Sequence, residues 1–161
     1  MLSPDYPAGP VRALCQQMGT RDVLHYGCGD RNLEKNLGFP ITNYDPRMEG
    51  LTDSPWPAKI VVVMDYLEHI QIHKLDILMN DLKELVLNVG LFVISRTPKE
   101  NDPDDRRRFL LKEGKDWWMQ FIGPRFTVRG INDTGEEAIF LVESSGRNND
   151  PRILSFLPIP N

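Results

Sequence analysis

A glycine turn at residues 25–30, His-Tyr-Gly-Cys-Gly-Asp, has the residue types best suited to hold a ligand. Glycine lacks a side chain, so the backbone can pass close beneath a bound molecule and can adopt a positive φ without steric cost. Asp45 lies eighteen residues after Gly27 and ends the next apolar run. A carboxylate in that place can accept hydrogen bonds from both hydroxyls of a ribose. A simple tight turn or a dinucleotide site would show a similar pattern.

The chain around this turn alternates between short apolar runs and amphipathic stretches, which predicts alternating strands and helices. Strands are predicted at residues 22–26, 41–44, 59–64, 91–95, 125–131 and 138–142. Helices are predicted at residues 11–18, 33–37, 72–86 and 112–121. Gly19, Gly38 and Gly90 are the expected stops of the first three helices. The sequence Asn-Asp-Thr-Gly at residues 132–135 indicates a hairpin between the last two strands.

Strands that alternate with helices form a parallel sheet with helices on both faces. Together with the closing hairpin, the pattern predicts an α/β fold with a doubly wound, mostly parallel sheet and an antiparallel edge strand. We expect a single domain over residues 1–161, with an irregular lead-in at 1–10 and a C-terminal tail at 144–161. Ligands bind such sheets beyond the carboxyl ends of the strands. Residues 27–30, Asp45, Asp65 and residues 95–97 should therefore meet at one edge.

The composition narrows the class of protein. Hydrophobic residues make up 40% of the 161 residues and charged residues 26%, which favours an ordered globular chain. The net charge of −4 argues against a general nucleic-acid coat. Cys15 and Cys28 form neither a disulfide framework nor a metal-ligand spacing, so we expect reduced thiols. With no apolar run long enough for a membrane span and no signal peptide at residues 1–10, we expect a cytoplasmic protein without membrane contact.

Four successive segments carry a resemblance to a known family. They are Val-Leu-His-Tyr-Gly-Cys-Gly at 23–29, Asn-Tyr-Asp-Pro at 43–46, Asp-Ser-Pro-Trp-Pro at 53–57 and Met-Asp-Tyr-Leu-Glu-His-Ile at 64–70. In order and spacing they resemble the motifs of the class I S-adenosylmethionine-dependent methyltransferases. The resemblance implies a Rossmann-like, seven-stranded sheet and S-adenosylmethionine as the cofactor. It does not identify the methyl acceptor.

The resemblance also implies roles for individual residues. Gly27, Cys28 and Gly29 would lie against the methionine part of the cofactor, Asp45 would hold the ribose, and Asp65 would meet the methionine end. Pro46, Gly50 and Leu51 would border the adenine. The sequence departs from the family at His25 and Arg31, which replace an acid and a third glycine, and at Lys59 and Gly50, where an acid is common. We expect His25 to be a hydrogen-bonded substitute for that acid. We expect the departures either to weaken cofactor binding or to change the electrostatic balance around the sulfonium.

Methyl transfer from a sulfonium is an in-line displacement, so positioning supplies much of the rate and a base assists an oxygen or nitrogen nucleophile. The candidate catalytic residues are Asp65, Glu68 and His69, with His73 one helical turn further on. Asp65, Glu68 and His69 also resemble a metal-ligand set of some O-methyltransferases. In many relatives the Leu-Glu-His-Ile segment only shapes the cofactor pocket, so no metal is predicted.

One run of basic residues bears on the chemistry of the methyl acceptor. Arg106, Arg107 and Arg108 follow the strand at 91–95, in a loop that often faces substrate in this fold. Three arginines there favour an acidic or phosphate-bearing acceptor, although neighbouring aspartates also suit a solvated, internally paired loop. No Asn-Pro-Pro-Tyr signature of DNA amine methylation occurs. The alternative is a non-catalytic member of the fold that acts as a binding or partner subunit. Since few residues remain for a lid, a partner subunit or a homo-oligomer could complete the pocket.

Overall fold

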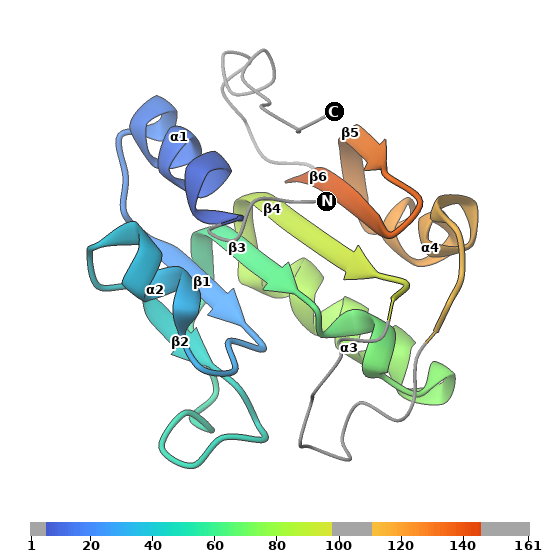
Figure 1. The fold of residues 1–161 in the computed structure, drawn as a ribbon, viewed down its shortest axis with the longest axis horizontal. Coiled ribbons are helices and arrows are strands. Elements are labelled where there is room, and N and C mark those ends of the chain that lie inside the picture. Colours follow the sequence, from blue (N-terminus) through green and yellow to red (C-terminus); the bar gives the residue numbers. More distant parts are fainter. Residues whose placement is uncertain (1–5, 98–110, 146–161) are drawn as a thin grey trace.

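In a computed structural model, which describes residues 6–97 and 111–145, six strands form one sheet in the order β2-β1-β3-β4-β6-β5 (Figure 1). The strands are β1 (Val23–Tyr26), β2 (Thr42–Tyr44), β3 (Ala58–Met64), β4 (Val86–Ser95), β5 (Phe126–Asp133) and β6 (Glu137–Ser144). The first four are parallel, whereas β6 runs antiparallel to both β4 and β5. The predicted α/β class, the mostly parallel sheet and its antiparallel edge are confirmed.

The seventh strand implied by the family resemblance is not found among the described residues. The connection from β2 to β3, where residues 53–57 lie, forms turns and irregular backbone only. Three prolines at positions 46, 55 and 57 lack the amide proton that a strand ladder needs, which disfavours a further strand there. Strand β2 is therefore one edge of the sheet and β5 is the other.

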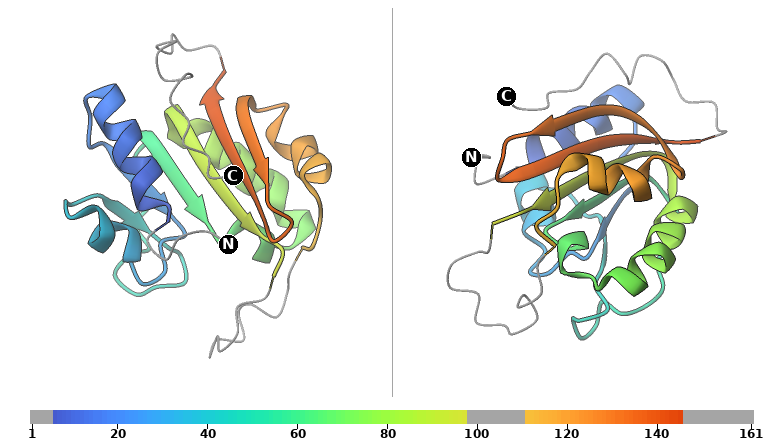
Figure 2. Two further views of the ribbon diagram at one scale, coloured as in Figure 1. Left: turned by 45° about the horizontal axis from the view of Figure 1, so that its top comes forward. Right: turned by 90° about the vertical axis from the view of Figure 1, so that its right-hand side faces the viewer.

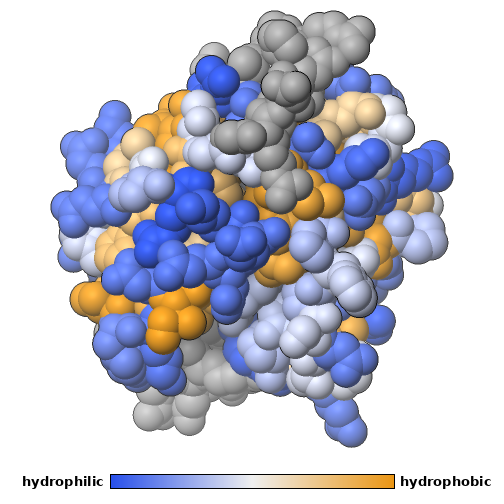
Figure 3. Space-filling view, turned by 180° about the vertical axis from the view of Figure 1, so that it is seen from behind, coloured by the Kyte–Doolittle hydropathy of each residue, from blue (hydrophilic) through white to orange (hydrophobic). Residues whose placement is uncertain are grey.

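Helices cover both faces of the sheet (Figure 2). Helices α1 (Ala8–Met18) and α2 (Asn32–Leu37) pack on one face, and α3 (Ile72–Leu85) and α4 (Lys115–Ile122) pack on the other. A short 3-10 helix, η1 (Leu67–His69), joins β3 to α3. None of the helices in the described part of the chain is long and apolar enough to cross a membrane. The surface on the α3 side shows hydrophobic patches separated by hydrophilic residues (Figure 3).

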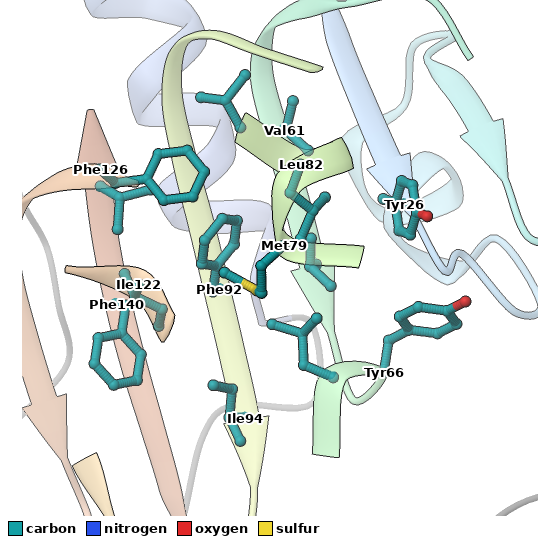
Figure 4. Packing of buried hydrophobic residues seen from close by; sticks show 14 of the residues in the cluster. Tyr26, Val61, Tyr66, Met79, Leu82, Phe92, Ile94, Ile122, Phe126 and Phe140 are labelled. Carbon is teal, nitrogen blue, oxygen red and sulfur yellow. The ribbon is translucent and has the colours of Figure 1, made fainter. Parts of the chain in front are cut away.

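The central strands supply side chains to two hydrophobic cores. On β3, Ile60 and Val62 belong to the core under α1 and α2, whereas Val61 and Val63 belong to the core under α3 and α4. Successive strand residues point to opposite faces, so a strand buried on both faces is apolar throughout. In Figure 4, Phe92 of β4 lies among residues of the core under α3 and α4. Its ring contacts that of Phe126 edge-on, with 5.4 Å between the ring centroids.

Three element boundaries differ from the prediction by three or more residues. Helix α3 ends at Leu85 and β4 begins at the next residue, Val86, so Gly90 lies inside a strand and does not end the helix. Helix α1 begins at Ala8 after Pro7, which makes the irregular lead-in shorter than residues 1–10. Helix α4 begins three residues later than predicted, at Lys115.

Candidate functional site

The carboxyl ends of β1, β2 and β3 meet at one edge of the sheet, as predicted. Strand β1 lies between β2 and β3, with Tyr26 in register with Tyr44 and Val63. The glycine turn follows β1, Asp45 follows β2, and Asp65 follows β3. Three residues or segments that are far apart in the sequence are thus brought to adjacent strand ends. This is the position where open α/β sheets bind their ligands.

The glycine turn has the backbone that its residues predict. Gly27 and Gly29 have φ angles of +76° and +53°, in the left-handed region that glycine enters freely. The Gly27 and Cys28 amides both donate to the Tyr44 carbonyl, at 2.7 and 3.1 Å. The Gly29 amide donates to Oδ2 of Asp45 at 3.0 Å. The turn is therefore tied to the end of β2 through backbone and carboxylate.

Cys28 lies within this turn as a buried free thiol, as does Cys15 in α1. Burial, reinforced by the nearby Asp45 carboxylate, raises the pKa of Cys28 to about 11. The thiolate is the nucleophilic form of cysteine. At neutral pH the Cys28 side chain is therefore protonated and contributes packing to the turn.

Asp45 is fully buried. Burial alone would raise the pKa of its carboxyl group, but hydrogen bonds from Arg47 and Gly29 outweigh burial and lower it. The Asp45 amide donates to the Leu51 carbonyl at 2.9 Å, which closes residues 45–51 into a compact loop. This closure keeps Pro46, Gly50 and Leu51 near Asp45; the first two are exposed and Leu51 is half-buried.

The Asp45 carboxylate is bound by the side chain of Arg47, a residue that the sequence did not single out. Its Nε donates to Oδ1 at 2.8 Å and its Nη2 donates to Oδ2 at 2.7 Å, a bidentate ion pair. Its backbone amide adds a bond to Oδ1 at 2.9 Å. An arginine two residues after a loop aspartate was the available signal, because such a side chain can fold back onto its neighbour.

Tyr66 is a second residue that the sequence did not single out. A Cβ added to Gly27 would lie 2.5 Å from Cγ and Cδ2 of Tyr66, so the tyrosine ring packs directly against that glycine. The Arg47 guanidinium carbon lies 4.7 Å from the centre of the Tyr66 ring. The Tyr66 ring meets that of Tyr26 edge-on at 5.6 Å, and Figure 4 shows both rings with their hydroxyls pointing away from Phe92 and Met79. Burial raises the pKa of Tyr66 to about 12.

His25 of β1 is buried and faces the layer of α1 and α2, because its neighbours Leu24 and Tyr26 belong to the opposite core. Neither ring nitrogen has a hydrogen-bond partner within the described part of the chain, so the hydrogen bond that we expected is not formed there. Burial lowers the pKa of His25 to about 4, against the opposing effect of Asp30, Asp45 and Asp65. The imidazole is therefore neutral at pH 7.

Two residues other than glycine have a positive φ among the described residues, and both lie at this edge. Asp65, at the end of β3, has φ +53°, and Arg31, which stands where the family has its third glycine, has φ +64°. Left-handed backbone costs free energy in residues with a side chain. Such residues concentrate at functional sites.

The predicted catalytic residues lie on and next to η1. Asp65 is half-buried, Glu68 is fully buried, and the side chain of His69 is 10% exposed. Nε2 of His69 lies 3.6 Å from Oε1 of Glu68. His73 is exposed on the first turn of α3. The structure thus groups Glu68 with His69, and their catalytic roles stay predictions.

Two further predictions concern a metal site and the arginines that would bind the acceptor. Within the described ranges, no group of three His, Cys, Asp or Glu side chains is placed to hold a metal ion. Arg106, Arg107 and Arg108, the predicted acceptor-binding residues, lie outside the described residues.

Comparisons with known proteins support the fold. No family model matches the chain. No curated protein matches it by sequence. The magnesium protoporphyrin IX methyltransferase of Synechocystis PCC 6803, solved with bound SAH, superposes with a TM-score of 0.61 at 16% identity, covering 88% of this chain and 83% of that one. The chain has a methyltransferase fold. The methyltransferase domain of bacterial Hen1 superposes with a TM-score of 0.63 at 15% identity, covering 86% of this chain and 97% of that domain.

A third solved structure carries both an acceptor and a cofactor product. It is the 1,6-didemethyltoxoflavin N1-methyltransferase of Burkholderia thailandensis with bound 1,6-didemethyltoxoflavin and S-adenosylhomocysteine. Its TM-score is 0.62 at 12% identity, and the match covers 87% of this chain and 77% of that one. At such identities the likeness establishes the arrangement of helices and strands, and the function rests on the site.

Proposed function

We propose that the protein is an S-adenosylmethionine-dependent methyltransferase. The observation that carries this proposal is the buried carboxylate of Asp45, which lies beyond β2 and accepts a hydrogen bond from Gly29 of the adjacent turn. A carboxylate beside a glycine turn, at the carboxyl ends of neighbouring parallel strands, is an adenosine-binding arrangement. The fold shared with the three methyltransferases supports the same proposal.

The residues at this edge fit the cofactor once the Arg47 side chain moves away from Asp45. The positive φ of Gly27 and Gly29 lets the turn pass close beneath a ligand, and the loop at residues 45–51 borders the ribose end. The Arg47 guanidinium, which is bonded to both oxygens of Asp45, must be displaced. When bound, the cofactor supplies an electrophilic methyl group on a sulfonium.

The residues of the chain would then hold and position the reactants. We assign to Asp65 or His69 the role of the base that removes a proton from the methyl acceptor. Asp65 lies at the end of β3 and His69 follows it. For Glu68, which is buried with Oε1 3.6 Å from Nε2 of His69, we propose a role in holding that imidazole. His25 is neutral at pH 7 and offers an imidazole nitrogen as a hydrogen-bond acceptor.

The cofactor proposal is tested by calorimetric titration with S-adenosylhomocysteine and, separately, with NAD. We expect S-adenosylhomocysteine to bind and NAD not to bind. Asp45→Asn, which keeps the size of the side chain, should abolish most of the binding because the carboxylate charge is lost. Glu143→Gln is the matched control, since Glu143 is a buried carboxylate paired with Arg129 elsewhere on the sheet. Binding of NAD alone would reject the proposal.

For the acceptor, we propose an acidic or phosphate-bearing molecule, on the basis of the three arginines at 106–108. Transfer of a labelled methyl group should be measured on pairs of acceptors that differ only in a phosphate or carboxylate group. We expect the charged member of a pair to be preferred, and the preference to be lost when the three arginines are replaced by alanine. Equal use of both members would remove this part of the proposal.

The second candidate function is a non-catalytic subunit with a methyltransferase fold. The observation that favours it is the bidentate Arg47–Asp45 pair, which occupies the ribose-binding carboxylate. Under this alternative no variant binds S-adenosylhomocysteine. The partner would be another subunit or a second copy of the chain.

A further inference from the structure

The hydrogen-bonding capacity of Asp45 is fully used inside the protein. An ionised carboxylate has about four lone-pair sites. Four donors occupy them: the backbone amides of Arg47 and Gly29, at 2.9 and 3.0 Å, and Nε and Nη2 of Arg47, at 2.8 and 2.7 Å. Two of the four come from one flexible side chain. The two hydroxyls of a ribose can therefore donate hydrogen bonds to Asp45 only after the Arg47 side chain has left the carboxylate.

The position of the Arg47 side chain allows it to move away from Asp45 into solvent. Its side chain is 25% exposed, whereas that of Asp45 has no exposed surface. One face of the guanidinium stacks over the Tyr66 ring at 4.7 Å. Stacking and a bidentate pair together hold the planar guanidinium in one place, while its partial exposure gives it a path to solvent.

Tyr66 connects Arg47 with the glycine turn. Its ring lies against Gly27, where a side-chain carbon would clash at 2.5 Å. The ring is 4% exposed. Arg47 stacks on Tyr66 and Tyr66 packs on Gly27, so the guanidinium on Asp45 is connected through this ring to the glycine turn.

We infer that Arg47, stacked on Tyr66, is an internal competitor for the cofactor site and sets the affinity for the adenosine ribose. The inference rests on the proposed function, because it concerns the same site. The site exists in a closed form with Arg47 on Asp45 and an open form that admits the ligand. The apparent dissociation constant then equals the intrinsic constant divided by the fraction of open molecules. Weak binding by the wild-type chain follows from this pair, in addition to any effect of His25.

The test compares the affinity of Arg47→Ala with that of the wild type for S-adenosylhomocysteine, by calorimetric titration. Arg47→Ala removes two donors from Asp45 but keeps both backbone amides, so the ribose hydroxyls meet a carboxylate with two open positions. We expect on the order of tenfold tighter binding, the change that follows when a competing pair of charge-assisted bonds is removed.

Arg129→Ala is the matched control. Arg129 also makes a bidentate contact to a buried carboxylate, with Nε 3.0 Å and Nη2 3.3 Å from the two oxygens of Glu143. That pair bridges β5 and β6, at the far side of the sheet from β1 and β2. We expect Arg129→Ala to bind S-adenosylhomocysteine with wild-type affinity. A general loosening of the fold would change both variants alike.

The outcomes separate the inference from the proposed function. Unchanged or weaker binding by a folded Arg47→Ala protein, with measurable binding by the wild type, overturns the inference and leaves the methyltransferase proposal intact. No binding by the wild type, by Arg47→Ala or by the Arg47→Ala/Tyr66→Ala double variant rejects both. If Arg47→Ala does not fold, Arg47→Lys keeps the charge but loses the bidentate contact. Its binding should then be tighter than that of the wild type, and equal or weaker binding overturns the inference.

Discussion

Arg31 stands in a backbone conformation that its side chain disfavours. Its φ and ψ are 64° and 31°, at the start of α2, where the family has a glycine. The sequence predicted the departure from the family but not that the backbone keeps the glycine-like geometry. Asp65 shares this feature at the neighbouring strand end. At this edge Arg31 and Asp65 thus have the left-handed backbone that glycine adopts most easily.

Arg31→Gly should therefore stabilise the protein by about 1 kcal/mol, because it removes the steric cost of a left-handed residue. The Arg31 side chain is exposed, so little packing is lost. The free energy of unfolding is measured by urea titration. Lys35→Gly, in the helical backbone of α2, is the control and should destabilise by about 1 kcal/mol. A loss of stability in Arg31→Gly would show that the arginine side chain is stabilising.

His25 predicts a pH dependence of stability. Its pKa falls from 6.5 to about 4 on folding, so between these values the unfolded chain binds a proton that the folded chain does not. Stability should therefore fall as the pH drops from 6.5 towards 4, by about 2 kcal/mol between pH 7 and pH 5.

The control for this pH dependence is His25→Gln, which does not titrate in this range. Urea unfolding of both proteins at pH 7 and pH 5 isolates the contribution of the imidazole, because the carboxylates titrate in both. Equal losses in the two proteins would mean that His25 is hydrogen-bonded or hydrated in solution.

At the residue scale, the sequence was sufficient for the glycine turn and Asp45 but not for Arg47 and Tyr66. The first two follow from residue type and strand order, which the apolar runs predict well. The positions of the other two depend on how the loop at residues 45–51 closes, through the bond from the Asp45 amide to the Leu51 carbonyl. Loop closure of this kind has no periodic signal in a sequence.

At the scale of elements, the junction of α3 and β4 shows where periodicity is ambiguous. Residues 85–93 read Leu-Val-Leu-Asn-Val-Gly-Leu-Phe-Val, an apolar run that suits a helix face or a buried strand. The helical spacing of the preceding residues extends the predicted helix into this run, with Gly90 as its predicted stop. In the structure Val86 already pairs with Ala58 of β3, and sheet pairing determines the boundary.

Gly90 supplies the prediction at this scale. It pairs with Val142 of β6, and an added Cβ would lie 2.9 Å from Cγ2 of Val142 and 3.1 Å from Cε1 of Phe92. Gly90→Ala should lower the free energy of unfolding by about 1–3 kcal/mol through overpacking between β4 and β6. The measurement is urea unfolding, and the double variant with Val142→Ala should lose less stability than the sum of the two single losses, because the smaller side chain relieves the contact.

Gly9 is the control for Gly90. It lies in α1 with no atom within 4 Å of an added Cβ. Gly9→Ala should stabilise by about 0.5–1 kcal/mol, because alanine loses less backbone entropy in a helix. A stabilising Gly90→Ala would contradict the close contact between the two strands.

At the scale of the whole molecule, one sheet joins two cores. Adjacent residues of β4 serve opposite sides: Leu91 packs under α1 and α2, and Phe92 packs under α3 and α4. If β3 or β4 separated from the helices on one face, the side chains that the strand contributes to the other core would be exposed as well. The single-domain organisation predicted from chain length stays a prediction, and this shared sheet is the physical reason to expect it.

The cores should therefore unfold together in a single transition, as expected of a small domain. Trp118 is fully buried under α3 and α4, and Cys15 is buried in α1 on the other face. In a Trp56→Phe/Cys28→Ala background, the remaining tryptophans, Trp117 and Trp118, report by fluorescence on the core under α3 and α4, and thiol labelling of Cys15 reports on the core under α1 and α2. Trp56 is 85% exposed, so its replacement should cost little stability. We expect the two urea midpoints to coincide with that of circular dichroism at 222 nm. Separate midpoints would mean that the helices on the two faces unfold as independent units, because the strands between them would then fail to couple the cores.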